Sequence, residues 1–489
     1  MKKRLLRLLF ILFLTVNWWL HIFAQPACAC DPLPDTQGSS ITVTNVGELI
    51  SAMQTANTTN GHTTIILEPG TYVLSANLPF IGSNMVGLTI RGATGDRDDI
   101  IIKGQGWNNN AVTHIFNVAA DSFTVADMTI GEVYYHPIQV HSNPNDADDF
   151  LAHNVRFIDA KEQLLKVSAG GALYADNGIV ECCAFEFIAG IAFQYYTGGI
   201  DAHRSKNWIV RQNVFKGIRS PDGTLSEHAI HFWRECAGTM VERNHIIDCD
   251  RGIGFGLGND PLNGHTGGTI KNNFVHCSRD VGIGLEFAPN TQILNNTVVV
   301  ENYSNAIEYR FAGTSNVHIA NNLTYGVITD RGSGASGIVE ANKTITDLSI
   351  FEDSGNYNYH LIASTPGITD AGITLAGITS DIDCQPRPDN AIFDIGADEY
   401  YDLSTVDIYV DHSGISLFPN PVEETFTISG LVGDYSIDIL DASGDVYRSY
   451  QDTMGTISID ISGLPAGLYF VKIENNTNHS AGVQLILKT

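Results

Sequence analysis

Residues 207–215 read NWIVRQNVF, and the same unit, a short apolar strand that ends at an asparagine, returns along the chain. It recurs as GTMVERNHI (238–246), GTIKNNFV (268–275), TQILNNTVV (291–299) and NVHIANNLT (316–324). The residue that closes this strand can be aligned eight times, 23 to 31 residues apart. It is Asp127, Asn154, Cys183, Asn213, Asn244, Asn273, Asn296 and Asn322. A period of about 20–50 residues is typical of stacked repeats. The repeat predicts coils of a parallel β-helix, in which stacked asparagines satisfy neighbouring backbone groups.

A second strand follows each unit, and these strands also align. Because side chains alternate along a strand, the second and fourth positions share one face and the third and fifth share the other. The first face is apolar and should form the core: Ile138, Leu165, Ile200, Ile230, Ile253, Ile283, Ile307 and Val140, Val167, Ala202, Phe232, Phe255, Leu285, Tyr309. The outward columns are Gln139, Lys166, Asp201, His231, Gly254, Gly284, Glu308 and His141, Ser168, His203, Trp233, Gly256, Glu286, Arg310. They predict one continuous polar surface.

The order of segments predicts an all-β chain with several parts. Residues 1–25 are expected to be a signal peptide, because four cations precede an apolar run, and residues 26–40 form a lead. Residues 41–400 are predicted to form a right-handed parallel β-helix catalytic domain, capped by a short amphipathic helix over 45–57. Residues 401–412 are expected to link it to a small β-sandwich over 413–489.

The net charge and the cysteine content restrict the binding partners and the cellular compartment that can be expected. Loss of the signal peptide would take the formal net charge from −27 to −31, which argues against nucleic acid as a partner. No stable transmembrane segment is expected in the mature chain. The eight cysteines suit an oxidising compartment, and Cys249 and Cys277, on successive coils, could pair. Their spacing shows no metal-site pattern, so no cofactor and no metal ligands are predicted, although a calcium ion is left open.

The C-terminal strands carry two recognisable motifs, Phe418-Pro419-Asn420-Pro421 and the hexapeptide LPAGLY over 464–469. With the alternating strands around them, they resemble the C-terminal sorting domain of the type IX secretion system. The resemblance implies the type IX secretion machinery as a partner. It also implies a protein that is secreted or attached to the cell surface.

Candidate site residues gather where the acidic chain becomes locally basic, over 200–251. This region holds eight Lys or Arg residues against seven acids, which indicates an anionic ligand unless some cations lie on the opposite face of the coil. The predicted catalytic residues are His203, Asp201, Arg234, Lys166, His231 and Tyr196. The predicted substrate-binding residues are Trp233, Glu286, Glu308, Arg310, Arg204 and His228. Strand alternation would place Arg234 inward, so its role requires a bulge or a strand end after Trp233.

Two segments in this region, YYTGGIDAHR (195–204) and HAIHFWRE (228–235), resemble the paired motifs of mannuronan C5-epimerases. Asp201, His203 and Arg234 match the Asp, His and Arg of that pattern. Ala202 replaces its proline, Tyr196 lies two residues further from the aspartate, and the interval between the motifs is longer. More broadly, the chain resembles the pectate-lyase-like superfamily of right-handed β-helices.

These observations leave several functions open, and an acidic polysaccharide is the expected substrate. The leading hypothesis is a secreted lyase that cleaves a uronate-containing polysaccharide by β-elimination, in which His203 is the base, Arg234 or Lys166 holds the carboxylate, and Tyr196 or His231 is the acid. A mannuronan-type C5-epimerase would use the same residues. A non-catalytic carbohydrate-binding or adhesive β-helix is a further alternative. A hydrolase would have only Glu286 and Glu308 as an evident outward carboxylate pair.

Overall fold

The computed structural model describes residues 28, 30, 32–33, 38–59, 62–143, 145–168, 170–389, 392–401, 415–440, 446–465, 467–476 and 481–488. The predicted signal peptide and all but the first residue of the predicted linker lie outside these residues. The chain divides between Tyr400 and Tyr401 into two compact units. Among the described residues, no helix is long and apolar enough to cross a membrane.

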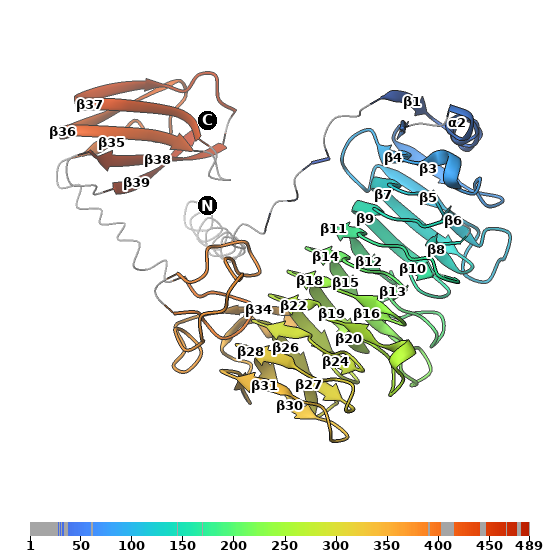
Figure 1. The fold of residues 1–489 in the computed structure, drawn as a ribbon. Helices are drawn as coiled ribbons and strands as arrows, with labels where there is room; N and C mark the ends of the chain where they lie inside the picture. The colour runs from blue at the N-terminus through green and yellow to red at the C-terminus, as the bar shows by residue number, and fades with distance from the viewer. Residues whose placement is uncertain are drawn as a thin grey trace, which may run out of the picture. The chain divides into compact units, whose positions relative to one another are not determined.

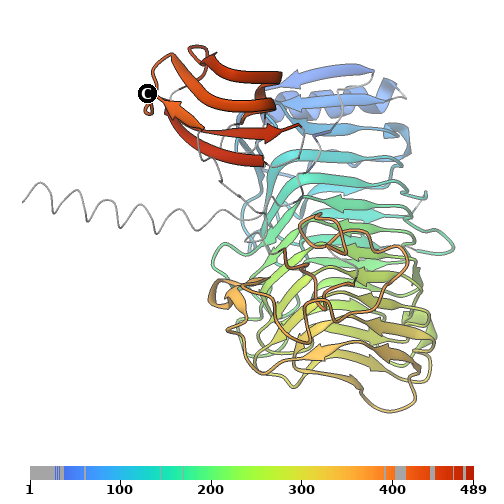
Figure 2. The ribbon, with the colours of Figure 1, turned by 90° about the vertical axis from the view of Figure 1, so that its left-hand side faces the viewer.

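The first unit is a parallel β-helix, whose short strands stack coil upon coil along one axis (Figures 1 and 2). One ladder contains β1 (Ser39–Val43), β2 (Thr63–Leu67), β4 (Thr89–Gly92), β11 (Ile179–Glu181), β14 (Ile209–Arg211), β18 (Met240–Glu242), β22 (Thr269–Lys271), β25 (Gln292–Leu294), β28 (Val317–Ala320) and β31 (Gly337–Glu340). A second contains β3 (Gly70–Val73), β5 (Ile100–Lys103), β12 (Ala184–Glu186), β15 (Val214–Lys216), β19 (His245–Cys249), β23 (Phe274–Cys277), β26 (Thr297–Val300), β29 (Leu323–Tyr325) and β32 (Lys343–Thr344). The long strands β7 (Thr124–Val133) and β9 (Leu151–Ala160) take part in both ladders.

The third face is a separate nine-stranded parallel sheet. Its strands are β6 (His114–Val118), β8 (His136–His141), β10 (Leu165–Ser168), β13 (Ile200–His203), β16 (His228–Trp233), β20 (Arg251–Phe255), β24 (Ile283–Glu286), β27 (Asn305–Arg310) and β30 (Val327–Asp330). The pairing joins Ile138, Leu165, Ile200, Ile230, Ile253, Ile283 and Ile307 in one column, and all seven are fully buried. The predicted register is confirmed.

The asparagines form an unbroken chain of side-chain amides at the corner between the two ladders. From Asn213 through Asn244, Asn273, Asn296 and Asn322 to Asn342, each Nδ2 donates to the next Oδ1 over 2.8–3.0 Å. Each of these acceptor oxygens also receives the backbone N–H of the preceding asparagine. The residue before each ladder asparagine, from Gln212 to Ala341, is left-handed, with φ between 50° and 56°. One left-handed residue per coil therefore turns the chain, and the amides replace the backbone hydrogen bonds lost at the turn.

Two further segments complete the first unit. Helix α2 (Val46–Thr59) covers the N-terminal end and buries Leu49, Ala52, Met53 and Ala56, as its amphipathic pattern predicts. After β32, the described residues between 346 and 400 fold back over both ladders, and they include β33 (Phe351–Asp353) and β34 (Asn358–Leu361). There Phe351 and Tyr359 pack with Phe274, Val299 and Leu323. A small pair, β17 (Cys236–Ala237) and β21 (His265–Thr266), lies at the edge of two coils.

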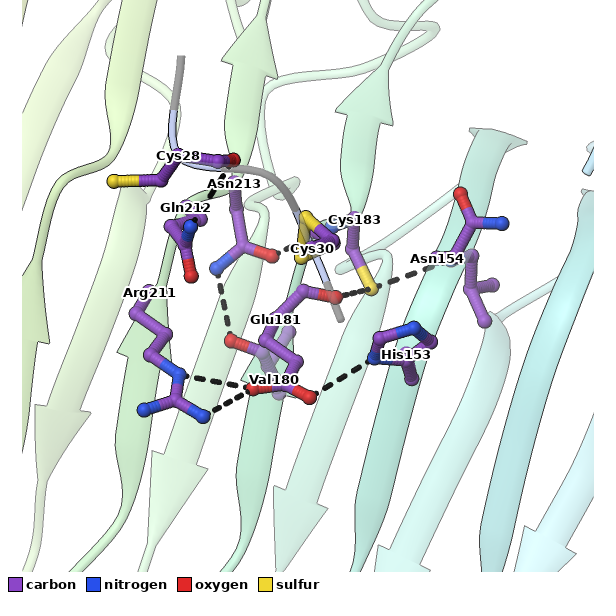
Figure 3. Close-up of a disulfide and its surroundings, with 12 residues drawn as sticks. Cys28, Cys30, His153, Asn154, Val180, Glu181, Cys183, Arg211, Gln212 and Asn213 are labelled. Atoms are coloured by element: carbon purple, nitrogen blue, oxygen red, sulfur yellow. Dashed lines mark hydrogen bonds and ion pairs between the residues drawn. A yellow bond between two sulfur atoms is a disulfide. The ribbon is translucent and has the colours of Figure 1, made fainter. Parts of the chain in front are cut away.

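Two disulfides hold the described cysteines of the N-terminal lead. Cys28 pairs with Cys384 in the segment that follows β32, and Cys30 pairs with Cys182 on a coil, the second of which is drawn in Figure 3. Cys28 lies beside the asparagine corner, where Gln212 Nε2 donates to the Cys28 carbonyl over 3.3 Å. The suggested disulfide between Cys249 and Cys277 is wrong, because both cysteines are free. They are buried and lie opposite each other on neighbouring strands. Neighbouring parallel strands lie about 4.8 Å apart with parallel side chains, whereas a disulfide requires two Cβ atoms about 3.8 Å apart that point toward each other.

Removal of the Cys30–Cys182 bridge should destabilise the β-helix. The bridge joins residues 152 positions apart, so its loss increases the freedom of a long unfolded loop. We expect the Cys30→Ala/Cys182→Ala double variant to lose about 2–4 kcal/mol of unfolding free energy. The denaturant midpoint, followed by circular dichroism, measures this loss, with Cys236→Ala, at a free buried thiol, as the control. An unchanged midpoint in the double variant would contradict the prediction.

The second unit is antiparallel and has its own apolar core, which includes Phe426, Ile437, Val471 and Ile486. Its strands are β35 (Ser416–Phe418), β36 (Thr425–Leu440), β37 (Val446–Asp460), β38 (Gly467–Asn475) and β39 (Ala481–Lys488). Hydrogen bonds join them in the order β35-β36-β38-β39, and β37 pairs with β36. The predicted all-β chain, with a parallel β-helix followed by a small antiparallel unit, is confirmed.

Candidate active site

The nine-stranded sheet places the predicted polar columns in register on its outer face. Lys166 on β10 pairs with Asp201 on β13, which pairs with His231 on β16, and the column continues through Gly254 and Gly284. In the next column, His203 pairs with Trp233 and Glu286 with Arg310. Strand alternation therefore brings side chains from six coils onto one surface.

Four of these side chains form a hydrogen-bonded group, the Lys166 cluster, made of Lys166, Asp201, His203 and Trp233. Lys166 Nζ donates a very short hydrogen bond to Asp201 Oδ2 and lies 3.3 Å from His203 Nε2. Trp233 Nε1 donates to Asp201 Oδ1 over 2.7 Å. The His203 ring packs edge-on against the Trp233 ring, with centroids 4.3 Å apart. The structure thus brings together four residues that the sequence assigns to one site.

Burial decides the charges within the Lys166 cluster. Lys166 and Asp201 are buried, with 9% and 4% of their surface exposed. Burial opposes the charged form of Asp201, but the Lys166 charge, the hydrogen bond from Lys166 and the neighbouring His203 and His231 together outweigh burial and lower the pKa of the carboxyl group. Burial lowers the pKa of His203 to about 4, and the Lys166 and Arg234 charges act in the same direction against the attraction of Asp201. At neutral pH the cluster therefore holds an ion pair beside a neutral imidazole that can accept a proton.

Two further predicted residues, Arg234 and Tyr196, interact with this cluster through charge. Strand β16 ends at Trp233, and Arg234 and Glu235 are both left-handed, with φ of 52° and 65°. This strand end turns Arg234 outward, against the inward direction that simple alternation would give, and its side chain is exposed. Within the described part of the chain, the Arg234 side chain has no hydrogen bond or ion pair. Tyr196 is 41% exposed, and burial together with the Asp201 charge raises the pKa of its phenol.

Most other cations of residues 200–251 serve ion pairs, many between neighbouring coils. The pairs are Arg204–Glu235, Arg211–Glu181, Arg219–Asp248, Arg243–Glu242 and Arg251–Asp280. Lys206 lies over the Tyr174 ring, 3.6 Å from its centroid. The local excess of cations therefore has a largely structural explanation, and Arg234 is a cation of this region for which the described residues provide no ion pair.

A pocket of about 550 Å³ opens on the same face, over the later coils. Its wall contains the predicted residues His228, Glu286, Glu308 and Arg310, and its floor contains Gly254, Gly256 and Gly284. The glycines make room, as predicted: a Cβ atom at Gly254 would lie 2.8 Å from His228 Nε2. Other lining residues were not predicted, among them Arg251, Arg279, Tyr303 and Arg331.

Two of the three acids of the pocket, Glu286 and Glu308, are held by donors from several coils. Glu286 accepts very short hydrogen bonds from Arg310 and from the Gly258 backbone N–H. Glu308 accepts hydrogen bonds from Tyr303, Asn305 and Arg331. Burial and the Glu308 carboxylate raise the pKa of Tyr303 to about 12. Tyr303 and Arg331 lie outside the aligned strand positions, so column reasoning could not find them.

The remaining predicted residues lie between the cluster and the pocket or at the coil edge. His231 is buried, its Nε2 lies 3.0 Å from the Gly256 carbonyl oxygen, and its ring stacks near Trp233. His228 faces the pocket, and burial holds the pKa of its ring well below the ordinary value. Arg204 is bound to Glu235 at 2.5 Å. The structure therefore separates the predicted site into the Lys166 cluster and the pocket, with two histidines between them.

Two groups of described side chains have the composition and spacing of metal ligands. One is Glu227, His228 and His231, and the other is His360, Asp383 and Asp398. In the second group, His360 Nε2 lies 2.7 Å from Asp383 Oδ2, and Asp398 accepts the Leu361 backbone N–H. The carboxylates outweigh burial and raise the pKa of His360 to about 9. In the structure this second group is an ion-pair network, and a metal ion would have to displace the proton of His360 to bind there.

Comparisons with known proteins support both units. Residues 416–488 match the family described as "Secretion system C-terminal sorting domain", and residues 186–347 match the family described as "Periplasmic copper-binding protein (NosD)". No curated protein is significantly similar to the chain in sequence.

Similar solved structures include a pectate lyase Pel9A, at 11% identity and a TM-score of 0.40, over 75% of this chain and 97% of the other. The A-module of the Azotobacter vinelandii mannuronan C-5 epimerase AlgE6 is similar at 14% identity and a TM-score of 0.37, over 61% of this chain and 93% of the other. The sorting domain indicates secretion and attachment to the cell surface. The chain is thus a parallel β-helix protein that ends in a secretion-system C-terminal sorting domain.

Proposed function

We propose that this protein is a secreted carbohydrate-active enzyme that cleaves a uronate-containing acidic polysaccharide by β-elimination. The observation that carries the proposal is the Lys166 cluster, in which a neutral His203 lies beside a buried ion pair and the exposed Arg234. Elimination at a uronate needs a base, a cation for the carboxylate and an acid for the leaving oxygen. His203 belongs to the cluster, Arg234 directly follows Trp233 at the end of the neighbouring strand, and the Asp201 charge acts on the Tyr196 phenol, which supports these three roles.

The polar face also offers a path for a polymer. From β10 to β27 the face crosses five strand spacings, roughly 24 Å, which is long enough for several sugar units. Trp233 offers an indole beside His203, and aromatic rings with a polar edge are well suited to pack against sugars. Arg310 and Arg331 line the pocket further along and can meet additional carboxylates of the same chain.

The proposed reaction assigns one role to each group. Arg234 binds the uronate carboxylate and withdraws charge from the sugar, which acidifies the proton at C5. His203 takes that proton. The electron pair of the broken C5–H bond forms the C4–C5 double bond, and the C4–O bond breaks. The leaving oxygen takes a proton from Tyr196, whose raised pKa keeps the phenol protonated. Lys166 and Asp201 act as positioning residues, because they already form an ion pair with each other.

A C5-epimerase is the second candidate, because Asp201, His203 and Arg234, which match the epimerase motif, are also the residues used in the proposed elimination. The first step is identical, but the proton returns to C5 from the opposite face and no bond to oxygen breaks. The hydrolase alternative is weaker. Hydrogen bonds from Tyr303, Asn305 and Arg331 already occupy the carboxylate oxygens of Glu308, one of the two acids that a hydrolase would need.

A substrate screen distinguishes these functions. The purified protein is incubated with polymannuronate, polyguluronate, polygalacturonate and a neutral glucan as control. A lyase produces an unsaturated uronate with new absorbance near roughly 235 nm, which follows from the double bond formed in the elimination. An epimerase in D₂O gives deuterium at C5 and an inverted sugar by NMR, without that absorbance. If acidic polysaccharides bind but none is changed, the protein is a binding or adhesive β-helix and the enzyme proposal is wrong.

The enzyme should keep its activity down to an unusually low pH. His203 must be unprotonated to act as the base, and its pKa is lowered to about 4, so the base form persists down to that pH. We expect kcat/KM, which reports groups of the unbound enzyme, to fall on acidification near pH 4 and not near 6.5. NMR titration of the His203 ring, assigned with the His203→Ala variant, gives a readout free of substrate ionisation. A ring that titrates near 6.5 would contradict the assigned environment.

A further inference from the structure

The junction between the Lys166 cluster and the pocket contains three side chains that the proposed reaction does not use. Glu227 immediately precedes β16, and His228 and His231 lie on that strand. One donor atom from each residue lies within 4.8 Å of the others. We propose that Glu227, His228 and His231 bind one divalent transition-metal ion of the zinc type. The inference does not depend on the proposed lyase activity.

The hydrogen bonds of His231 fix which of its nitrogens could bind the ion. His231 Nε2 lies 3.0 Å from the Gly256 carbonyl oxygen, and a carbonyl only accepts, so Nε2 carries the proton. In the neutral ring, Nδ1 then has a lone pair, and it lies 3.9 Å from Glu227 Oε2. That separation is too long for a hydrogen bond. In this form of the ring, two acceptor atoms lie 3.9 Å apart, and a cation bound between them would satisfy both.

The backbone contact of His231 also matches how proteins hold metal-binding histidines. Such histidines commonly donate their second ring N–H to a backbone carbonyl or a carboxylate, which fixes the ring and makes the other nitrogen more basic. The Gly256 carbonyl has this position relative to His231. The ring is 1% exposed, so its orientation is set by packing before any ion arrives.

His228 supplies an independent observation. Its Nδ1 atom is buried and has no hydrogen-bond partner among the described residues, which is costly for a polar atom unless a ligand occupies it. Its ring centroid lies 4.6 Å from that of His231. An ion shared by the two rings would remove the cost of the unpaired nitrogen.

The donor set suits a borderline divalent ion. Two imidazoles and a carboxylate are a common ligand set for Zn²⁺, whereas Ca²⁺ and Mg²⁺ prefer oxygen ligands alone. The Glu227 side chain is 33% exposed and His228 lines the pocket, so solvent can reach the group. Three protein ligands leave at least one coordination position for water. Alignment of the columns did not indicate this three-ligand group, because it treats position 228 as the start of a strand and position 227 as a loop.

Zinc binding to the purified full chain, without a histidine tag and after dialysis against EDTA, tests the inference. We expect isothermal titration with Zn²⁺ to give one ion per chain, and Co²⁺ to give a visible absorption spectrum that Zn²⁺ displaces. Glu227→Gln keeps the size of the side chain but removes the charge, and it should weaken binding by at least about tenfold. His228→Ala should weaken it further, because it removes a ligand side chain altogether, whereas glutamine at position 227 keeps a neutral oxygen donor.

The matched control is Glu162→Gln, since Glu162 also lies beside a buried histidine, with its Oε2 atom 3.6 Å from His136 Nε2, but belongs to no three-ligand group among the described side chains. It should bind Zn²⁺ as the wild type does. Circular dichroism confirms that each variant is folded. Absence of stoichiometric binding in the folded wild type would overturn the inference, and so would equal affinity in Glu227→Gln, His228→Ala and the wild type.

Discussion

Replacement of His203 by alanine is expected to lower kcat on the acidic polysaccharide by at least about 100-fold, with little change in KM. His203 is neutral at neutral pH and lies beside the exposed Arg234, so it is the group best placed to take the C5 proton. A base acts in the transition state, and its loss therefore affects turnover far more than binding. Steady-state kinetics, followed through the absorbance of the unsaturated product, measures both constants.

Arg234→Ala gives a contrasting result in the same assay. Arg234 holds the carboxylate already in the bound substrate, so its loss should raise KM as well as lower kcat. His318→Ala is the matched control, because His318 is a partly exposed histidine on β28, in a different ladder, where it pairs with Glu340. It should retain wild-type kinetics. Near-full activity of the His203→Ala variant would show that the base lies elsewhere.

Replacement of Asn244 by alanine is expected to cost on the order of 3–5 kcal/mol of unfolding free energy. The Asn244 side chain accepts from the backbone and the amide of Asn213, and it donates to the carbonyls of Val210 and Glu242 and to Asn273. All of these contacts are buried, and alanine would leave several polar groups unpaired at once. Each unpaired buried group costs about 1–3 kcal/mol, and the costs within one network are not additive.

Asn342→Ala is the matched comparison, because Asn342 is the last asparagine of the same chain of side-chain amides and is only partly buried. Water can reach the groups that this change exposes, so we expect a loss of about 1 kcal/mol. Denaturant midpoints followed by circular dichroism compare the two variants. Equal shifts would contradict the view that the amide chain is a continuous buried network.

Much of the candidate site could be read from the sequence because the repeat fixes the register. Once the core column of Ile200, Ile230 and Ile253 is aligned, period-two alternation places Lys166, Asp201, His203 and Trp233 on one face. Their hydrogen bonds in the structure follow from that register. What alignment could not show is that Lys166 and Asp201 are buried and bound to each other, which makes them positioning residues in the proposed reaction.

The sequence by itself determined the coil register and the polar face, because both depend on local periodicity within strands of known direction. The tertiary structure alone decided the features that arise between strands. The pairing of Cys28 with Cys384 spans 356 residues, and nothing in the local pattern encodes such a contact. Tyr303 and Arg331 reach the pocket from segments outside the aligned columns, and Glu227 reaches His231 from the residue before a strand. Connections between strands vary in length and path from coil to coil, so their side chains meet only when the chain is folded.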